Sequence, residues 1–179
     1  RMNTIFTSYP DTATAYSAMQ QVIANGIEID DFQVGKSAYI AGDYQAAINA
    51  FNSYTTSHQL AAIPAELHLM LGRAYREIGN SDAATVAFQT IIDQYPQDAL
   101  FGDALLERGR TRFLADDIPA AISIYTNIAD TYDYLTDAAG EALWRVGYLY
   151  GTNGEPVLSR QTFTRLADSY PNHELTTNG

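Results

Sequence analysis

Three basic side chains recur at a constant spacing in a chain that is otherwise strongly acidic. Lys36, Arg73 and Arg110 lie 37 residues apart, and Tyr148 follows 38 residues later. The whole chain carries 10 lysines and arginines against 21 aspartates and glutamates, for a formal net charge of -11. Ammonium and guanidinium groups form charge-assisted hydrogen bonds with carboxylates. The spacing therefore predicts a basic row that holds an anionic ligand, if repeated elements bring these positions onto one face.

Catalytic and metal-binding patterns are not found in the sequence. His58, His68 and His173 stand at no spacing that would place two of them on one helix face, and no acidic pair completes a metal site. The nucleophile elbow, the P-loop and the dinucleotide fingerprint do not occur. The chain has no cysteine, which excludes disulfide and thiolate chemistry. We therefore expect no catalytic residue, no metal and no cofactor.

Charge and hydropathy narrow the classes of partner. A chain with a net charge of -11 is a poor match for a nucleic-acid backbone, which requires a basic surface. No apolar run approaches the roughly 20 residues of a membrane span. Lys36 is the only lysine beside nine arginines, and we interpret this bias as an indication of an extracytoplasmic protein.

The basic row belongs to an internal repeat with a period of 37–38 residues. Each unit has an anchor glycine directly before the position of the row and a large aromatic residue sixteen residues after the glycine. The glycines are Gly35, Gly72, Gly109 and Gly147, and the aromatic residues are Phe51, Phe88, Tyr125 and Phe163. Self-similarity at such a period is typical of a solenoid, in which each unit buries its face against its neighbours.

The register predicts an all-α fold, a right-handed superhelical solenoid of antiparallel helix pairs. A single domain over residues 1–179 is expected to contain repeats at 33–62, 63–97, 98–134 and 135–171. Residues 1–32 are interpreted as the end of a preceding repeat with an extra helix and a linker, and residues 172–179 as the start of a further one. The chain is thus expected to be a fragment cut at both ends, whose exposed ends self-associate in vitro; its oligomeric state is left open.

Turn and packing residues follow the same register. Gly42, Gly79 and Gly154 are expected to end the first helix of their units at positive φ, with Asp116 in their place in the third unit. The residues that follow, Asp43, Asn80 and Asp117, are expected to cap the second helices. The aromatic residues are predicted to be core. The anchor glycines are predicted to be close-approach positions facing small residues, namely Ala47, Ala84, Ala121 and Ser159.

The pattern from Gln33 to Pro171 resembles the tetratricopeptide repeat. That family has a glycine, an aromatic residue three on, an alanine twelve on, an aromatic sixteen on and a proline twenty-four on. Arg108 and Ser159 depart from the family's residue types, and Tyr132-Asp133 ends the third unit without a proline. More narrowly, Glu141 to Asn172 and Ile27 to Phe51 resemble the superhelical, non-catalytic part of bacterial soluble lytic murein transglycosylases. This second resemblance implies a periplasmic protein of the cell wall, with its catalytic domain beyond residue 179.

The tetratricopeptide resemblance also implies a site. In that family the first helix of each unit forms the concave wall, and the residue after the anchor glycine points into it. With the positions one turn away, the candidate ligand-binding residues are Lys36, Arg73, Arg76, Arg110, Phe113, Trp144 and Tyr148. A groove of this kind fits a carboxylate-bearing protein segment or peptidoglycan. In the alternative interpretation the basic residues only form salt links on the helix surface, for example with Glu77 and Glu107.

Two functions therefore remain open from the sequence. The first is a non-catalytic scaffold or ligand-binding module of a larger cell-wall lytic enzyme. The second is a stand-alone extracytoplasmic adaptor that binds a protein segment in its concave groove. The helical array does not discriminate between them, because a fold does not fix a function.

Overall fold

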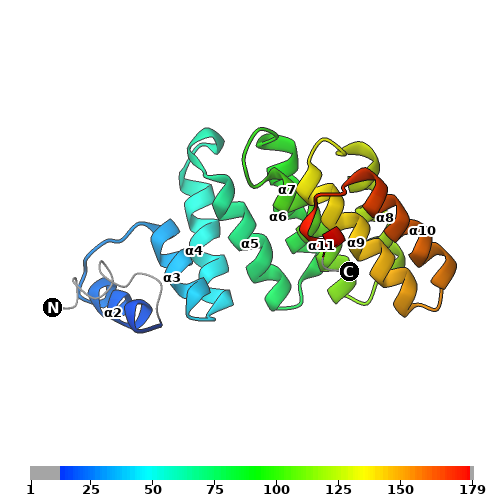
Figure 1. Cartoon of the computed structure of the whole chain (residues 1–179). Coiled ribbons are helices and arrows are strands. Elements are labelled where there is room, and N and C mark those ends of the chain that lie inside the picture. Colours follow the sequence, from blue (N-terminus) through cyan, green and yellow to red (C-terminus); the bar gives the residue numbers. More distant parts are fainter. Residues whose placement is uncertain (1–12, 178–179) are drawn as a thin grey trace. The chain divides into compact units, whose positions relative to one another are not determined.

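The computed structural model describes residues 13–177, which fall into two compact units. One unit comprises the residues up to Thr90 and the other the residues from Ile91 onward. All the regular secondary structure in the described part of the chain is helical (Figure 1).

In its described residues, the first unit contains four helices, a short 3-10 turn and the beginning of a fifth helix, α6, which continues past Thr90. Consecutive helices pack against each other from α2 to α5, and α3 also contacts α5. In chain order they are α2 Ala13–Ala24, α3 Asp31–Ile40, α4 Tyr44–Ser57, the 3-10 turn Leu60–Ala62, α5 Ala65–Glu77 and α6 Ser81–Gln94.

The second unit continues the alternation with two complete helix pairs and a short terminal helix. Here α8 packs against both α7 and α9, and α10 packs against α9. A further contact joins α7 to α9, so the first helices of successive pairs lie side by side. The bounds are α7 Phe101–Leu114, α8 Ile118–Thr131, α9 Thr136–Thr152, α10 Pro156–Ser169 and α11 Glu174–Thr177.

The turns inside the helix pairs use the residues that the sequence predicts. Gly42, Gly79 and Gly154 have φ values of 81°, 79° and 79°, and Asp116 adopts φ 60° at the equivalent place. Glycine adopts this left-handed conformation without a Cβ clash, and aspartate is one of the few other residues that tolerate it. The chain can therefore reverse in a few residues and return as the second helix.

Side-chain caps then start the second helices of three pairs. The carboxylates of Asp43 and Asp117 and the amide oxygen of Asn80 each accept a hydrogen bond from the backbone N–H three residues later, at 3.1, 3.2 and 3.1 Å. Such caps satisfy one of the free N–H groups at a helix start. In the fourth pair Glu155 makes no side-chain cap, and Pro156 begins the helix instead.

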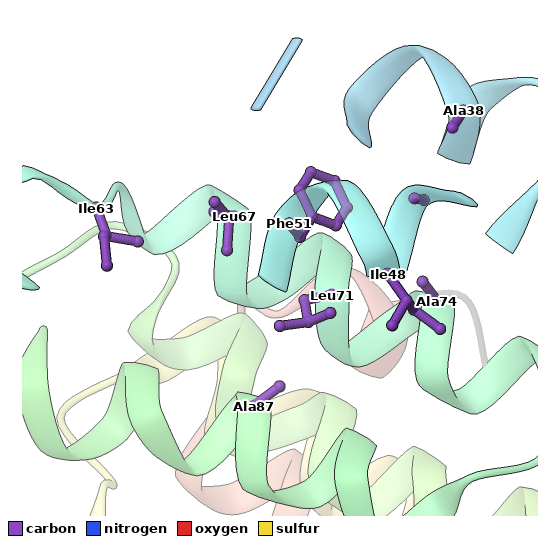
Figure 2. Packing of buried hydrophobic residues seen from close by; sticks show 9 residues of the cluster. Ala38, Ile48, Phe51, Ile63, Leu67, Leu71, Ala74 and Ala87 are labelled. Carbon is purple, nitrogen blue, oxygen red and sulfur yellow. The ribbon is translucent and has the colours of Figure 1, made fainter. Parts of the chain in front are cut away.

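The aromatic residues of the repeat are buried in three pairs and partly exposed in the fourth. Phe51 and Phe88 are 0% exposed and Tyr125 is 1% exposed, as predicted. Figure 2 shows Phe51 among the apolar side chains of α4 and α5, including Leu67 and Leu71. Phe163 is 37% exposed, so its assignment to the core was wrong in extent. The main packing partner of α10 is α9, and Leu166 of α10 also packs against Ala129 of α8.

The anchor glycines face aromatic rings, a contact that was not predicted from the sequence; their approach to Ala47, Ala84 and Ala121 stays a prediction. A Cβ built on Gly72 would lie 2.5 Å from Phe88 Cε1, and one on Gly109 would lie 2.5 Å from Tyr125 Cε1. In the fourth pair the predicted neighbour is close by, since Ser159 Oγ donates a hydrogen bond to the Gly147 carbonyl oxygen at 2.8 Å. The glycines are therefore required because a ring occupies the space of the missing Cβ.

The predicted all-helical architecture of antiparallel helix pairs is confirmed for residues 13–177. The repeat boundaries and the single-domain assignment stay predictions. The expected end of a preceding repeat, at the start of residues 1–32, lies outside the described residues. Within the described range, no helix combines the length and the apolar character needed to cross a membrane.

Replacing Gly72 by alanine should destabilise the protein by about 1–3 kcal/mol. The added Cβ overlaps the fully buried Phe88 ring, and overpacking of this kind outweighs the roughly 1 kcal/mol that alanine gains in a helix. Urea unfolding followed by circular dichroism measures the change.

The matched control is Gly102→Ala in α7, where an added Cβ would lie 3.4 Å from Ala138 Cβ, an ordinary contact. This variant should be as stable as the parent or slightly more stable. If Gly72→Ala behaves like Gly102→Ala, the glycine-to-ring packing does not limit the helix pair.

Candidate functional site: an aromatic pocket beside an acidic groove

One face of α9 carries most of the side chains of the candidate site. Residues three or four positions apart lie on the same face of a helix. This spacing places five side chains on one face of α9: Asp137, Glu141, Trp144, Arg145 and Tyr148. All five line hollows of the second unit, and neighbouring hollows share residues along α9. The face of α9 therefore runs from one hollow to the next.

We call the first two hollows the acidic groove. One has a volume of about 560 Å³ and is lined by the N-terminal ends of α7 and α9 and the segments before them. The other, of about 590 Å³, lies between α9 and the segment around α11. They share Asp137 and Glu141, and only one arginine lines them. The lining carboxylates are Asp98, Asp103, Asp137, Glu141 and Glu174.

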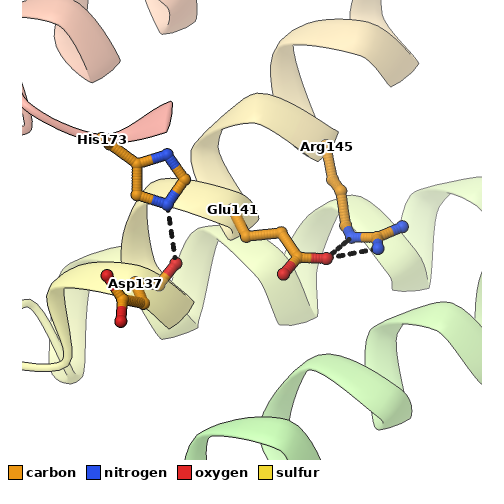
Figure 3. A network of polar contacts seen from close by, with 4 residues as sticks. All are labelled: Asp137, Glu141, Arg145 and His173. Atoms are coloured by element: carbon orange, nitrogen blue, oxygen red, sulfur yellow. Dashed lines mark hydrogen bonds and ion pairs between the residues drawn. The ribbon is translucent and has the colours of Figure 1, made fainter. Parts of the chain in front are cut away.

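The carboxylates of the acidic groove differ in how far they are neutralised. Glu141 forms an ion pair with Arg145, in which Arg145 Nε donates to Glu141 Oε1 at 2.9 Å (Figure 3). Asp98 accepts a hydrogen bond from the Leu100 backbone N–H at 2.9 Å. In the described part of the chain, the carboxylates of Asp103 and Asp137 make no hydrogen bond or ion pair; only the Asp137 carbonyl oxygen is engaged, by His173 Nε2 at 3.2 Å. The groove therefore keeps an excess of negative charge.

The third hollow, which we call the aromatic pocket, is small and largely apolar. It has a volume of about 80 Å³ and is lined by Phe113, Tyr125, Trp144, Arg145, Tyr148 and Leu149. The Trp144 and Tyr148 rings are stacked, with centroids 5.5 Å apart and planes 9° from parallel. Phe113 is 37% exposed and Tyr148 is 48% exposed, so large apolar surfaces border the opening. Exposed aromatic residues around a hollow are typical of a binding surface.

Tyr125 places a buried polar atom in the aromatic pocket. Its side chain is 1% exposed, and its hydroxyl has no hydrogen-bond partner among the described residues. Burial raises the pKa of Tyr125 to about 12, an effect that the nearby Arg145 charge, 5.6 Å from the ring centroid, partly opposes. The hydroxyl is therefore protonated at neutral pH and can donate or accept a hydrogen bond. Such unpaired buried groups are rare and call for an explanation.

Three of the predicted site residues come together in the second unit. Phe113, Trp144 and Tyr148 all line the aromatic pocket. Arg110 lies one turn before Phe113 on α7, exposed and close enough for its charge to lower the pKa of Tyr125 slightly against the larger effect of burial. Within the described range Arg110 makes no ion pair.

The other predicted site residues belong to the first unit. Lys36 Nζ is 2.8 Å from Glu66 Oε1 and 5.4 Å from the Phe32 ring centroid, so this lysine forms the helix-to-helix salt link of the alternative interpretation. Burial raises the pKa of Tyr39, and the charges of Arg73 and Arg76 partly oppose this rise. Both arginines therefore lie near Tyr39. A basic row continuous over both units stays a prediction.

Sequence reasoning missed several residues of this site, among them Glu141 and its partner Arg145. Arg145 lies four residues after Glu141, a spacing that indicates a helical ion pair. Tyr125 was assigned to the core alone, although a tyrosine among phenylalanines at a repeated position is a signal for a polar role. Asp103 and Asp137 fall in the first turns of α7 and α9, where acidic residues need no further explanation. Nothing in the sequence distinguishes them from ordinary helix-start residues.

The histidines occupy three different environments. His68 is buried, and the loss of hydration lowers its pKa. His58 stacks on Tyr54 with ring centroids 3.9 Å apart, and His173 packs against Gly140. The described residues contain no group of three or more histidine and carboxylate side chains arranged to hold a metal ion.

Family models describing the tetratricopeptide repeat match most of the chain. One model matches residues 33–99 and 69–134, and a second matches residues 141–173. The chain belongs to the tetratricopeptide repeat family. This membership agrees with the glycine and aromatic register from which the resemblance was inferred.

Solved structures of low sequence identity share the fold. A crystal structure of the MamA protein has a TM-score of 0.66 at 19% identity, covering 94% of this chain and 87% of that chain. The C-terminal part of a tetratricopeptide protein from Cytophaga hutchinsonii has a TM-score of 0.67 at 15% identity; 96% of this chain aligns with 64% of that one. YrrB, a tetratricopeptide protein with an unusual peptide-binding site, has a TM-score of 0.56 at 15% identity, covering 99% of this chain and 78% of that chain. No curated protein matches the chain.

Replacing Tyr125 by phenylalanine should leave the fold intact and raise the free energy of unfolding by about 1 kcal/mol. The ring that packs on Gly109 is kept, while a buried hydroxyl without a partner is removed. Urea unfolding measures the difference. Tyr134→Phe, at a residue that is 67% exposed, is the control and should change nothing; a clear loss of stability in Tyr125→Phe would show that the hydroxyl has a structural partner.

Proposed function

We propose that this chain is a non-catalytic adaptor module that binds an extended segment of another protein along the α7 and α9 face of its second unit. The observation that carries the proposal is the aromatic pocket, with Phe113, Trp144 and Tyr148 around it, adjoining the acidic groove along α9. Aromatic side chains in a hollow are the usual anchors of a protein interface. Membership of the tetratricopeptide family supports this function, and the peptide-binding site of YrrB supports it by analogy.

The dimensions of the site favour an extended segment. Asp137 and Tyr148 are eleven residues apart on α9, which corresponds to about 16 Å at 1.5 Å per residue. An extended chain advances about 3.3 Å per residue, so about five residues cover this length. Hollows in a row along one helix offer successive side chains of such a segment separate places to bind.

The module of a cell-wall lytic enzyme is the hypothesis that we do not favour. It rests on the resemblance of Glu141–Asn172 to lytic transglycosylases, and neither the family models nor the site residues add support to it. We do not favour peptidoglycan as the ligand for the same reason. Sedimentation of the protein with purified murein sacculi would support both the lytic-enzyme module and the peptidoglycan ligand. We also propose an extracytoplasmic location, from the scarcity of lysine beside arginine, and fractionation of the source cells tests it.

Trp144 allows a direct test, because it is the only tryptophan of the chain and it lines the aromatic pocket. The full chain is used to select peptides from a random displayed library, and the enriched peptides are synthesised. Peptides that bind at the site should change the Trp144 fluorescence in a saturable way. If no enriched peptide does so, the adaptor function of this face is rejected.

Replacing Tyr148 by alanine should weaken the binding of the selected peptides at least tenfold. The variant removes a ring that is stacked on Trp144 and 48% exposed, so it opens one wall of the pocket without disturbing the core. Calorimetric titration measures the affinity.

The control for this variant is Val157→Ala, which truncates a 56% exposed side chain of α10 that lines none of the three hollows. Its affinity should equal that of the parent. Equal affinities for Tyr148→Ala and the parent would exclude the pocket as the binding site.

A further inference from the structure

We propose that the bound segment is basic and carries one apolar anchor residue with a polar tip. The anchor side chain enters the aromatic pocket and meets the Tyr125 hydroxyl, while lysine or arginine residues of the same segment lie in the acidic groove. The inference rests on the proposed function and specifies the chemistry of the partner.

The aromatic pocket selects the anchor by size and polarity. Since one water-sized group needs about 10–15 Å³ on this measure, a volume of about 80 Å³ holds about five to eight heavy atoms. This range extends from glutamine, with five side-chain heavy atoms, to tyrosine, with eight. The walls are mostly aromatic carbon, so the body of the anchor is apolar. A polar atom at its tip gives the Tyr125 hydroxyl a hydrogen bond that none of the described residues provides.

The acidic groove selects the flanking residues by charge. Asp103 and Asp137 have no counter-charge within the described part of the chain, and the Arg145 guanidinium that borders the groove is already bound to Glu141. A cationic side chain from the partner would compensate these carboxylates. The net charge of -11 attracts a basic segment from a distance and disfavours a second copy of the same chain as the occupant.

The geometry of α9 sets the spacing between the anchor and the basic residues. Glu141 lies seven residues and Asp137 eleven residues before Tyr148, or about 10 and 16 Å along the helix. At about 3.3 Å per residue, these distances correspond to about three and five positions of an extended segment. Peptides selected from a random library should therefore carry lysine or arginine about three and five positions from an apolar residue, all on one side of it.

Charge removal tests the groove. The double variant Asp103→Asn with Asp137→Asn keeps the side-chain shapes and removes two negative charges. It should weaken the binding of the selected peptides about three- to tenfold. High salt should weaken binding to the parent protein more than binding to the double variant. The matched control is Asp168→Asn on α10, the same change at an exposed residue that lines none of the three hollows, and it should bind like the parent.

The Tyr125→Phe variant tests the floor of the pocket. It should weaken the binding of the selected peptides about three- to tenfold, which corresponds to the loss of one hydrogen bond. The free variant should nevertheless be at least as stable as the parent. A purely structural role for the hydroxyl predicts the opposite pattern, with lower stability and unchanged affinity.

The outcomes separate this inference from the proposed function. Peptides that are neutral or acidic and still change the Trp144 fluorescence would overturn the basic partner and leave the adaptor function standing. A failure of all peptides at Trp144 would overturn both. A Trp144 signal that depends on protein concentration alone would identify a second copy as the occupant and overturn the inference as well.

Discussion

The packing of an aromatic ring against a glycine holds each helix pair together. In the pairs that contain Gly72 and Gly109, the ring of Phe88 or Tyr125 lies where a Cβ would be, only 2.5 Å from that position. Removing the side chain from one helix lets the ring of the other come close to its backbone and bury completely. The residue after each glycine is then directed away from this contact, which is why Arg110 and Tyr148 of the second unit are exposed while Tyr125 is buried.

The same contact gives the third pair its special property. Tyr125 has the packing of Phe51 and Phe88, but its ring carries a hydroxyl into a place where none of the described residues pairs with it. The side chains around it come from α7, α8 and α9, so a core position of one helix pair becomes the floor of a pocket shared with the next.

The two ends of α9 differ in the chemistry of the hollows that they line. At the N-terminal end of this helix, carboxylates dominate the hollows, and at its C-terminal end aromatic rings do. The ion pair between Glu141 and Arg145 stands between the two, so the one guanidinium that lines them does little to offset the negative charge of the groove. A surface of this kind discriminates between partners by electrostatic complementarity at one end and by apolar burial at the other.

Sequence by itself determined the local structure of this protein. The period of the repeat, the left-handed turns at Gly42 and Asp116, and the burial of Phe51 and Phe88 follow from spacing and from the conformational preferences of single residues. Only the tertiary structure decided which side chains meet. Lys36 pairs with Glu66 thirty residues later, and Asp103 and Asp137 line one groove although they are 34 residues apart. Periodicity assigns a residue to a face of its own helix, whereas the distance between two faces depends on how closely the helices pack, and that is set by all the side chains between them.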